Sequence, residues 1–121
     1  MANPNGRKGS LFETTALKWL RTKNVTAERL TKAGAKDEGD IVVTANGKVY
    51  ILELKATKAI KLPEFWAEAV IEAQHYAEAR NLSEIPPSYV MLKRRMAGIE
   101  KAWVIEDAEQ WIQRITTCKC N

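Results

Sequence analysis

The chain has 121 residues, of which 45% are hydrophobic and 28% charged, and a net charge of +4. This length supports one domain, residues 1–121, and the composition is typical of a globular protein rather than a disordered one. No stretch approaches the roughly 18 consecutive apolar residues of a membrane span, and the polar first residues do not resemble a secretory signal. Cys118 and Cys120 are too few for a disulfide framework, or for structural zinc unless another chain contributes. We therefore expect reduced thiols, a cytoplasmic protein, and neither a membrane partner nor a small-molecule cofactor.

Charge is unevenly distributed along the chain. Residues 1–36 carry eight basic and two acidic side chains, residues 37–79 carry four and eight, and residues 80–121 carry seven and five. An acidic middle between basic flanks suits an anionic polymer held by basic segments over a carboxylate centre. Random scatter of charge on a basic protein is the alternative.

The first elements are predicted from caps and apolar spacing. Residues 1–9 predict a flexible basic arm, and Ser10 is a good N-cap for a helix over residues 11–21. A short strand is predicted over residues 27–32, followed by a loop of small residues at 33–36.

The next segment, residues 40–56, predicts a β-hairpin. Asn46-Gly47 lies between two runs rich in β-branched residues, and a two-residue type I′ turn needs positive φ at both central positions. With that turn, Ala45 pairs with Lys48. Both faces of the second strand are largely apolar, which indicates a central strand covered on both sides.

A long helix and two strands follow the hairpin. Pro63 opens the helix, where its missing N–H costs nothing, and the helix ends near Arg80. Gln74 lies at the edge of the apolar stripe of this helix. Strands are predicted over residues 88–93 and 101–105.

A final amphipathic helix begins at Asp107, with Trp111, Ile112 and Ile115 expected to face the core. The predicted order, αβββαββα, indicates an α/β fold in which helices flank a mixed β-sheet. Four tryptophans fall on apolar stripes, where core or dimer packing is favoured over base stacking: Trp19, Trp66, Trp103 and Trp111.

The hairpin brings two carboxylates face to face. In its predicted register Asp40 lies opposite Glu53, where Cβ atoms are roughly 4.5–5.5 Å apart and like charges destabilise the pair. Such a pair needs a proton or a cation between its members. Lys55 leaves the same strand face two residues later. The arrangement is that of a metal-dependent hydrolase; a surface Glu53–Lys55 pair and a turn role for Asp40 are the alternatives.

Together with Glu13 on the preceding helix, these residues resemble the PD-(D/E)XK nuclease superfamily. The spacing is most similar to that of archaeal-type Holliday junction resolvases. One departure is visible, since Gly39 stands where the family has a proline that performs no chemistry. The resemblance implies a restriction-endonuclease-like fold. The resembling segments are residues 6–13, 39–42, 53–57 and 74–76.

The resemblance also implies a role for each site residue. Asp40 and Glu53 are expected to hold Mg2+, for which Mn2+ can substitute, and Glu13 to bind a second metal or its water. Lys55 is expected to orient the attacking water or stabilise charge developing on phosphate, and Gln74 to hold a water or phosphate. An exposed helix glutamate and a polar boundary residue are the alternatives for Glu13 and Gln74.

The implied substrate is branched DNA, a four-way junction cut symmetrically by a homodimer that supplies two active sites. Another PD-(D/E)XK nuclease, of restriction or RecB-like type, and a non-catalytic DNA-binding protein on this fold are the alternatives. Thr57 is either a phosphate contact or an ordinary strand-end threonine, and solvated surface charge is the alternative for the basic residues. The candidate DNA contacts are Arg7, Lys8, Ser10, Thr57, Lys58, Lys61, Lys93, Arg94 and Arg95.

Overall fold

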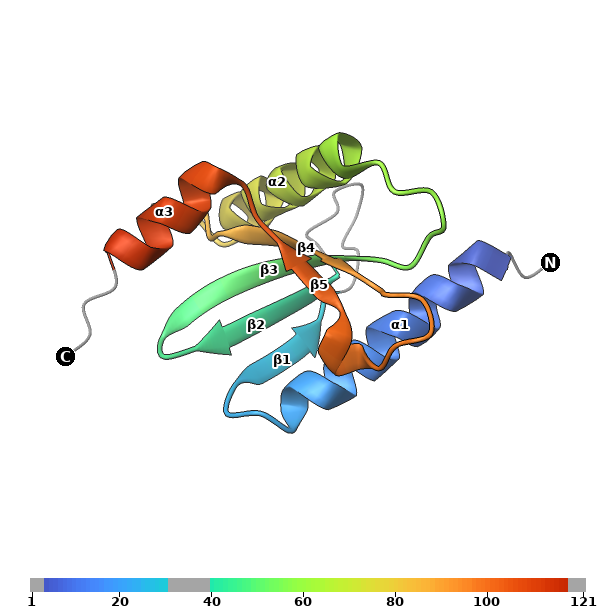
Figure 1. The fold of residues 1–121 in the computed structure, drawn as a ribbon. Coiled ribbons are helices and arrows are strands. Elements are labelled where there is room, and N and C mark those ends of the chain that lie inside the picture. The colour runs from blue at the N-terminus through green and yellow to red at the C-terminus, as the bar shows by residue number, and fades with distance from the viewer. Residues whose placement is uncertain (1–3, 31–39, 118–121) are drawn as a thin grey trace.

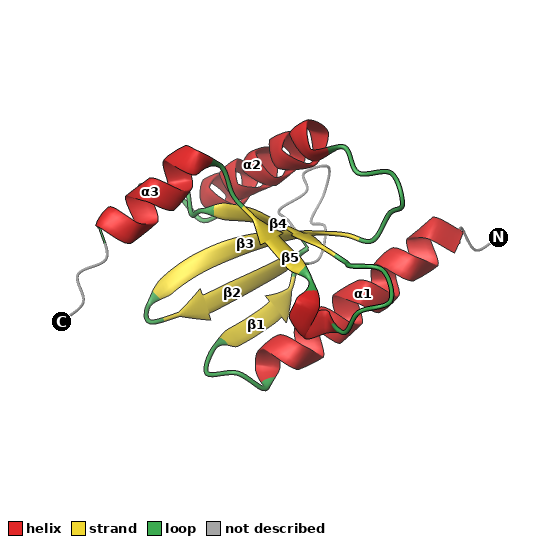
Figure 2. Cartoon of the chain, in the orientation of Figure 1, coloured by secondary structure: helices red, strands yellow, loops and turns green. Residues whose placement is uncertain are grey.

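The computed structural model describes residues 4–30 and 40–117, with side chains of the first helix from residue 11 onward. The elements follow the predicted order, with one added 3-10 helix between the last two strands (Figures 1 and 2). Their bounds are α1 Pro4–Arg21, β1 Thr26–Arg29, β2 Ile41–Ala45, β3 Lys48–Lys55, α2 Leu62–Ala79, β4 Ser88–Leu92, η1 Ile99–Lys101, β5 Trp103–Ile105 and α3 Ala108–Thr116.

One mixed sheet organises the described residues, with the strand order β1-β2-β3-β4-β5. Strands β3 and β4 run parallel, and the other neighbouring strands run antiparallel. The prediction that the second hairpin strand is central is confirmed, because β3 occupies the middle of the sheet. Within the described residues, no helix is both long and apolar enough to cross a membrane.

Helices cover the two faces of the sheet (Figure 1). On one face, Phe12 of α1 packs in a cluster with Leu52 and Leu54 of β3. On the other face, α2 packs on the alternate strand residues, as in the cluster that Ala73 forms with Ile51. Because successive side chains of a strand point to opposite faces, residues 53 and 55 lie on the α2 face with Ile51.

The hairpin turn and register are as predicted. Asn46 and Gly47 have φ angles of 53° and 77°, the positive values that a type I′ turn needs. Ala45 pairs with Lys48, and the ladder continues without a bulge to Ile41.

The N-terminal prediction is wrong in part. Helix α1 begins at Pro4, so most of the predicted arm is helical and Ser10 lies inside the helix instead of capping it. Proline at the first helical position has a suitable φ and loses no helical hydrogen bond. Pro4 was therefore a signal for the start of the helix, and the prediction based on Ser10 did not use it. The strand predicted over residues 27–32 is found at Thr26–Arg29, and residues 31 and 32 lie outside the described residues. The predicted loop at 33–36 lies outside the described residues.

The C-terminal helix also differs from its prediction. Asp107 caps α3 as expected, since its Oδ1 accepts from the N–H of Gln110 at 2.8 Å. The apolar face is not in the core, however: Trp111, Ile112 and Ile115 are each 45–48% exposed. Helix α3 follows the edge strand β5, so it lies beside the sheet rather than over it (Figure 1).

The tryptophans divide accordingly. Trp19 and Trp66 are half-buried, whereas Trp103 and Trp111 are exposed. Core packing is therefore the wrong prediction for the two tryptophans of β5 and α3.

Candidate active site

Asp40 is held where the β2 strand begins. Its N–H donates to the carbonyl of Leu52 at 3.1 Å, and its own carbonyl accepts from Leu30 N–H at 3.0 Å. The side chain turns inward, and its Oδ2 accepts from the backbone N–H of Leu54 at 2.7 Å. The ladder between β2 and β3 ends with Ile41 opposite Leu52. Asp40 lies just before Ile41, and its carboxyl group is hydrogen-bonded to that of Glu53.

Glu53 is buried, with only 4% of its surface exposed. Burial, followed by hydrogen bonding and repulsion from the carboxyl groups of Asp40 and Glu72, raises the pKa of Glu53 to about 12. Without a cation, Glu53 therefore keeps a proton at neutral pH. This matches the expectation that the facing pair needs a proton or a cation.

Glu72 is a site residue that the sequence analysis missed. It is a buried residue of α2 and reaches Glu53 from the helix side. Its signal was available, since it falls on the helical spacing of the buried α2 residues, where a carboxylate is out of place. Those buried residues are Phe65, Ala69, Glu72, Ala73, Tyr76 and Ala77.

Gln74 does not join the carboxylates. It is exposed, and the buried stripe of α2 passes through its neighbours at 72, 73, 76 and 77 instead. Two residues along a helix correspond to about 200° of rotation, so Gln74 points away from the side of α2 on which Glu72 lies.

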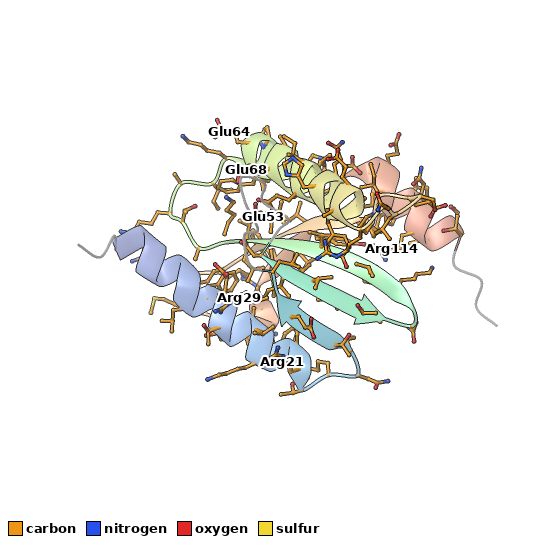
Figure 3. The ribbon with its side chains drawn as sticks, turned by 180° about the vertical axis from the view of Figure 1, so that it is seen from behind. Arg21, Arg29, Glu53, Glu64, Glu68 and Arg114 are labelled. Carbon is orange, nitrogen blue, oxygen red and sulfur yellow. The ribbon has the colours of Figure 1, made fainter. Side chains whose placement is uncertain are left out.

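Lys55 is the last residue of β3, and Figure 3 shows its partner Glu68 on α2, close to Glu53. Its Nζ lies 2.6 Å from Oε2 of Glu68, another residue absent from the predicted site, and 5.0 Å from the ring centroid of Phe65. Burial opposes the ammonium charge, but the hydrogen bond to Glu68 and the neighbouring carboxyl groups outweigh it, so the pKa of Lys55 is raised. Lys55 is therefore a cation at neutral pH.

Glu13 is near the carboxylate pair from the α1 side. Burial and the charge of Asp40 raise its pKa, while Arg29 opposes the rise. The Nε of Arg29 lies 3.7 Å from Oε1 of Glu13. Glu13 is thus close enough to Asp40 to feel its charge, but it is paired with Arg29.

The donor set fits Mg2+ through two residues. Within the described ranges, 4–30 and 40–117, no group of three or more His, Cys, Asp or Glu side chains is arranged to hold a metal ion. Mg2+ often binds through one or two carboxylates and completes its shell with waters and substrate phosphates. Asp40 and Glu53 meet that requirement, and a cation between them would take the place of the proton on Glu53.

The basic candidate residues of the loops after β3 and β4 lie at one end of the sheet. The carboxyl ends of β3 and β4 lie together because these strands are parallel, and Lys93 N–H donates to the carbonyl of Lys55 at 3.0 Å. The loops after both strands extend from this end of the sheet (Figure 1). Each of these loops carries exposed cations: Lys58, Lys61, Lys93, Arg94 and Arg95.

The remaining DNA candidates divide differently. The hydroxyl of Thr57 donates to the carbonyl of Ala59 at 2.8 Å, a bond within its own loop. The side chains of Arg7, Lys8 and Ser10, and the whole of Gly39, lie outside the described residues.

A hollow of about 800 Å³ lies away from the carboxylates. It is bordered by Gly47 at the hairpin tip, by Pro86 before β4 and by Arg114 on α3. The two carboxylates are therefore at the opposite end of β3 from the broad hollow.

The fold class is α/β: a mixed, restriction-endonuclease-like sheet flanked by helices, as expected. A solved structure of this fold is that of Hjc, a Holliday junction resolvase from the archaeal hyperthermophile Archaeoglobus fulgidus. The TM-score is 0.52 and the identity 21%, over 83% of this chain and 89% of that chain. The expected resemblance to archaeal-type resolvases is thus confirmed at the level of the fold. Neither a family model nor a curated protein matches the sequence.

Proposed function

We propose that this chain is a Mg2+-dependent endodeoxyribonuclease that recognises DNA structure and resolves four-way junctions. The observation that carries the proposal is the pairing of Asp40 with buried Glu53, with Lys55 on the same face of the sheet. The fold shared with an archaeal resolvase supports the same reading.

Each residue has a chemical role in this proposal. Asp40 and Glu53 hold the cation, which when bound polarises the phosphodiester and promotes ionisation of water. Lys55 donates hydrogen bonds to the phosphate oxygens as their charge increases. For this, Lys55 leaves Glu68, which holds its ammonium in the DNA-free protein. The cations of the two loops hold the strand by its phosphates.

The proposed assembly is a homodimer. A four-way junction has approximate two-fold symmetry, and two cuts placed symmetrically need two active sites. The exposed apolar residues of α3 offer surface for such an assembly.

The test incubates the protein and Mg2+ with end-labelled four-way junction, duplex and single-stranded DNA of one shared sequence. Paired symmetric nicks on the junction are expected, with none from Asp40→Asn or Glu53→Gln. Both variants are expected to bind the junction in EDTA, since neither adds bulk or removes a basic group.

The outcomes separate the alternatives. Cutting of duplex or single strands in preference to the junction would assign the chain to another nuclease type of this superfamily. Junction binding with no metal-dependent cutting would make it a DNA-binding protein on a nuclease fold.

A further inference from the structure

Trp103 is an exposed aromatic residue with a cation on its ring. It lies on the edge strand β5 and is 53% exposed. The guanidinium of Arg94, from the loop after β4, lies 5.0 Å from the centroid of its indole ring. This contact holds the two planar groups together at the surface.

The pair lies in a row with the proposed catalytic lysine. Lys55 is the pairing partner of Leu92, and Leu92 is the pairing partner of Trp103. Facing residues on neighbouring strands share a face of the sheet, so Trp103 lies on the α2 face with Lys55. Two strand spacings separate the two residues, roughly 10 Å.

The space between them is filled by packed apolar side chains. Phe65 of α2 packs against Leu92, and the ammonium of Lys55 lies over the ring of Phe65. Trp103 is therefore the outer end of a row that begins at the active site. A DNA strand held at Lys55 can place a nucleotide a few positions away at Trp103, since phosphates along one strand are roughly 3.4 Å apart along the duplex axis and about three such steps span this distance.

We propose that Trp103 and Arg94 form a stacking platform for an unpaired nucleobase within a few nucleotides of the cleaved phosphate. Every base has a flat face that stacks on an aromatic ring or a guanidinium plane. In a continuous duplex those faces are already stacked on one another, so only a base freed at a branch or in a single strand can use the platform. The inference rests on the proposed nuclease function and names a residue pair that favours branched substrates.

A different occupant of Trp103 would be a second copy of this chain. The cation on the ring favours nucleic acid, because Arg94 adds positive charge beside two further exposed cations, Lys93 and Arg95. An interface between identical subunits would bring these charges close to one another.

The test measures binding in EDTA, with no cutting needed. Two single-stranded probes of equal length and charge are compared: an oligothymidylate and the same backbone with every base removed. Wild-type protein is expected to bind the thymine probe about tenfold more tightly than the abasic one. Trp103→Leu, which keeps an apolar side chain, is expected to abolish this ratio without changing affinity for the abasic probe. Trp103→Phe is expected to restore most of it.

Trp111→Leu is the matched control, since it removes an equally exposed tryptophan from α3. It is expected to leave the ratio unchanged. The platform is refuted if Trp103→Leu keeps the wild-type ratio, or if wild type binds both probes equally. If Trp103→Leu keeps the wild-type ratio of thymine to abasic binding and also converts a dimer to a monomer, Trp103 belongs to a subunit interface instead. A Trp103-dependent ratio in a protein that cuts no DNA would leave the platform standing and reject the nuclease function.

Discussion

Glu53 is the residue at which burial and charge conflict most strongly. Its pKa in the folded chain, about 12, lies far above the value of 4.5 for an unperturbed glutamate. Between those values the folded state binds the proton that the unfolded state has released, so the free energy of unfolding falls as pH rises above about 4.5.

In EDTA we expect the free energy of unfolding to decrease from about pH 5 to about pH 9, by at most about 1.4 kcal/mol per pH unit from this one group. Glu53→Gln keeps the size of the side chain and removes the titration, so the variant is expected to show a flatter profile. Urea unfolding of both proteins across this range measures the difference. A wild-type profile no steeper than that of Glu53→Gln would show that Glu53 does not retain its proton.

Lys55 supplies a positive charge that no other described residue places on this part of β3. We expect Lys55→Ala to lower the single-turnover rate of junction cutting by two or more orders of magnitude, a typical loss for one group that stabilises the transition state. Lys55→Arg is also expected to be slow, because a planar guanidinium does not take the place of a compact ammonium.

Glu68→Gln is the control for Lys55. It removes the ion pair of the DNA-free protein but keeps the lysine, so cutting is expected to continue. If Lys55→Ala cuts at nearly the wild-type rate, its role is in packing against Phe65 and not in the reaction.

The juxtaposition of side chains could be predicted where the information is local. Asp40, Glu53 and Lys55 are brought together by a turn of two residues, whose sequence determines the register. The helical spacing could mark Glu72 as buried, but which strand residues Glu72 and Glu68 meet depends on the packing of α2 on β3. Gln74 is exposed, because a residue at the edge of an apolar stripe can face either the site or the solvent, and helical periodicity does not decide which.

At the scale of elements, the hairpin is the device that positions the carboxylates. Gly47 has a φ of 77° with open space around the position of a Cβ atom. Gly47→Ala is therefore expected to lower the free energy of unfolding by about 1–2 kcal/mol through backbone strain alone. The variant molecules that are folded are expected to cut DNA at the wild-type rate. Equilibrium unfolding and cutting rates measure the two effects.

An insertion in the same turn supplies the contrast. One added residue shifts the pairing, and a shift by one residue turns every side chain to the other face. Such a variant is expected to lose cutting altogether. Normal activity after the insertion would mean that the turn does not determine the site.

Helices α1 and α3 show why their boundaries and faces were harder to predict. An amphipathic pattern indicates that a helix has an apolar face, but it does not identify what covers it. Trp111, Ile112 and Ile115 have the spacing of core residues, yet the helix follows an edge strand and leaves them exposed.

At the scale of the whole molecule, basic side chains gather at the end of the sheet where β3 ends with Lys55. If Lys93 and Arg95 each contact a phosphate, removing one is expected to reduce the slope of log affinity against log salt by about 0.9 on duplex arms. Junction-binding titrations in EDTA over a range of salt concentrations measure the slope. Lys48, an exposed cation at the far end of β3, is the matched control. An equal change in slope from Lys48→Ala would show that basic residues affect binding through the net charge of the protein and not through contacts at the Lys55 end of the sheet.

Asp40 and Glu53 are proposed to share one metal ion. The most direct measurement is the melting temperature of the protein with and without millimolar Mg2+ or Mn2+, for wild type and Asp40→Asn. A ligand of the folded state stabilises it by mass action, so metal is expected to raise the wild-type value. In Asp40→Asn most of this rise is expected to disappear, while asparagine keeps an oxygen for the hydrogen bond from Leu54 N–H. With no metal, the variant is expected to be close to wild type in stability, because Glu53 is protonated there and asparagine can still accept its hydrogen bond. An unchanged wild-type melting temperature, together with an Asp40→Asn variant that is only destabilised, would contradict the shared site.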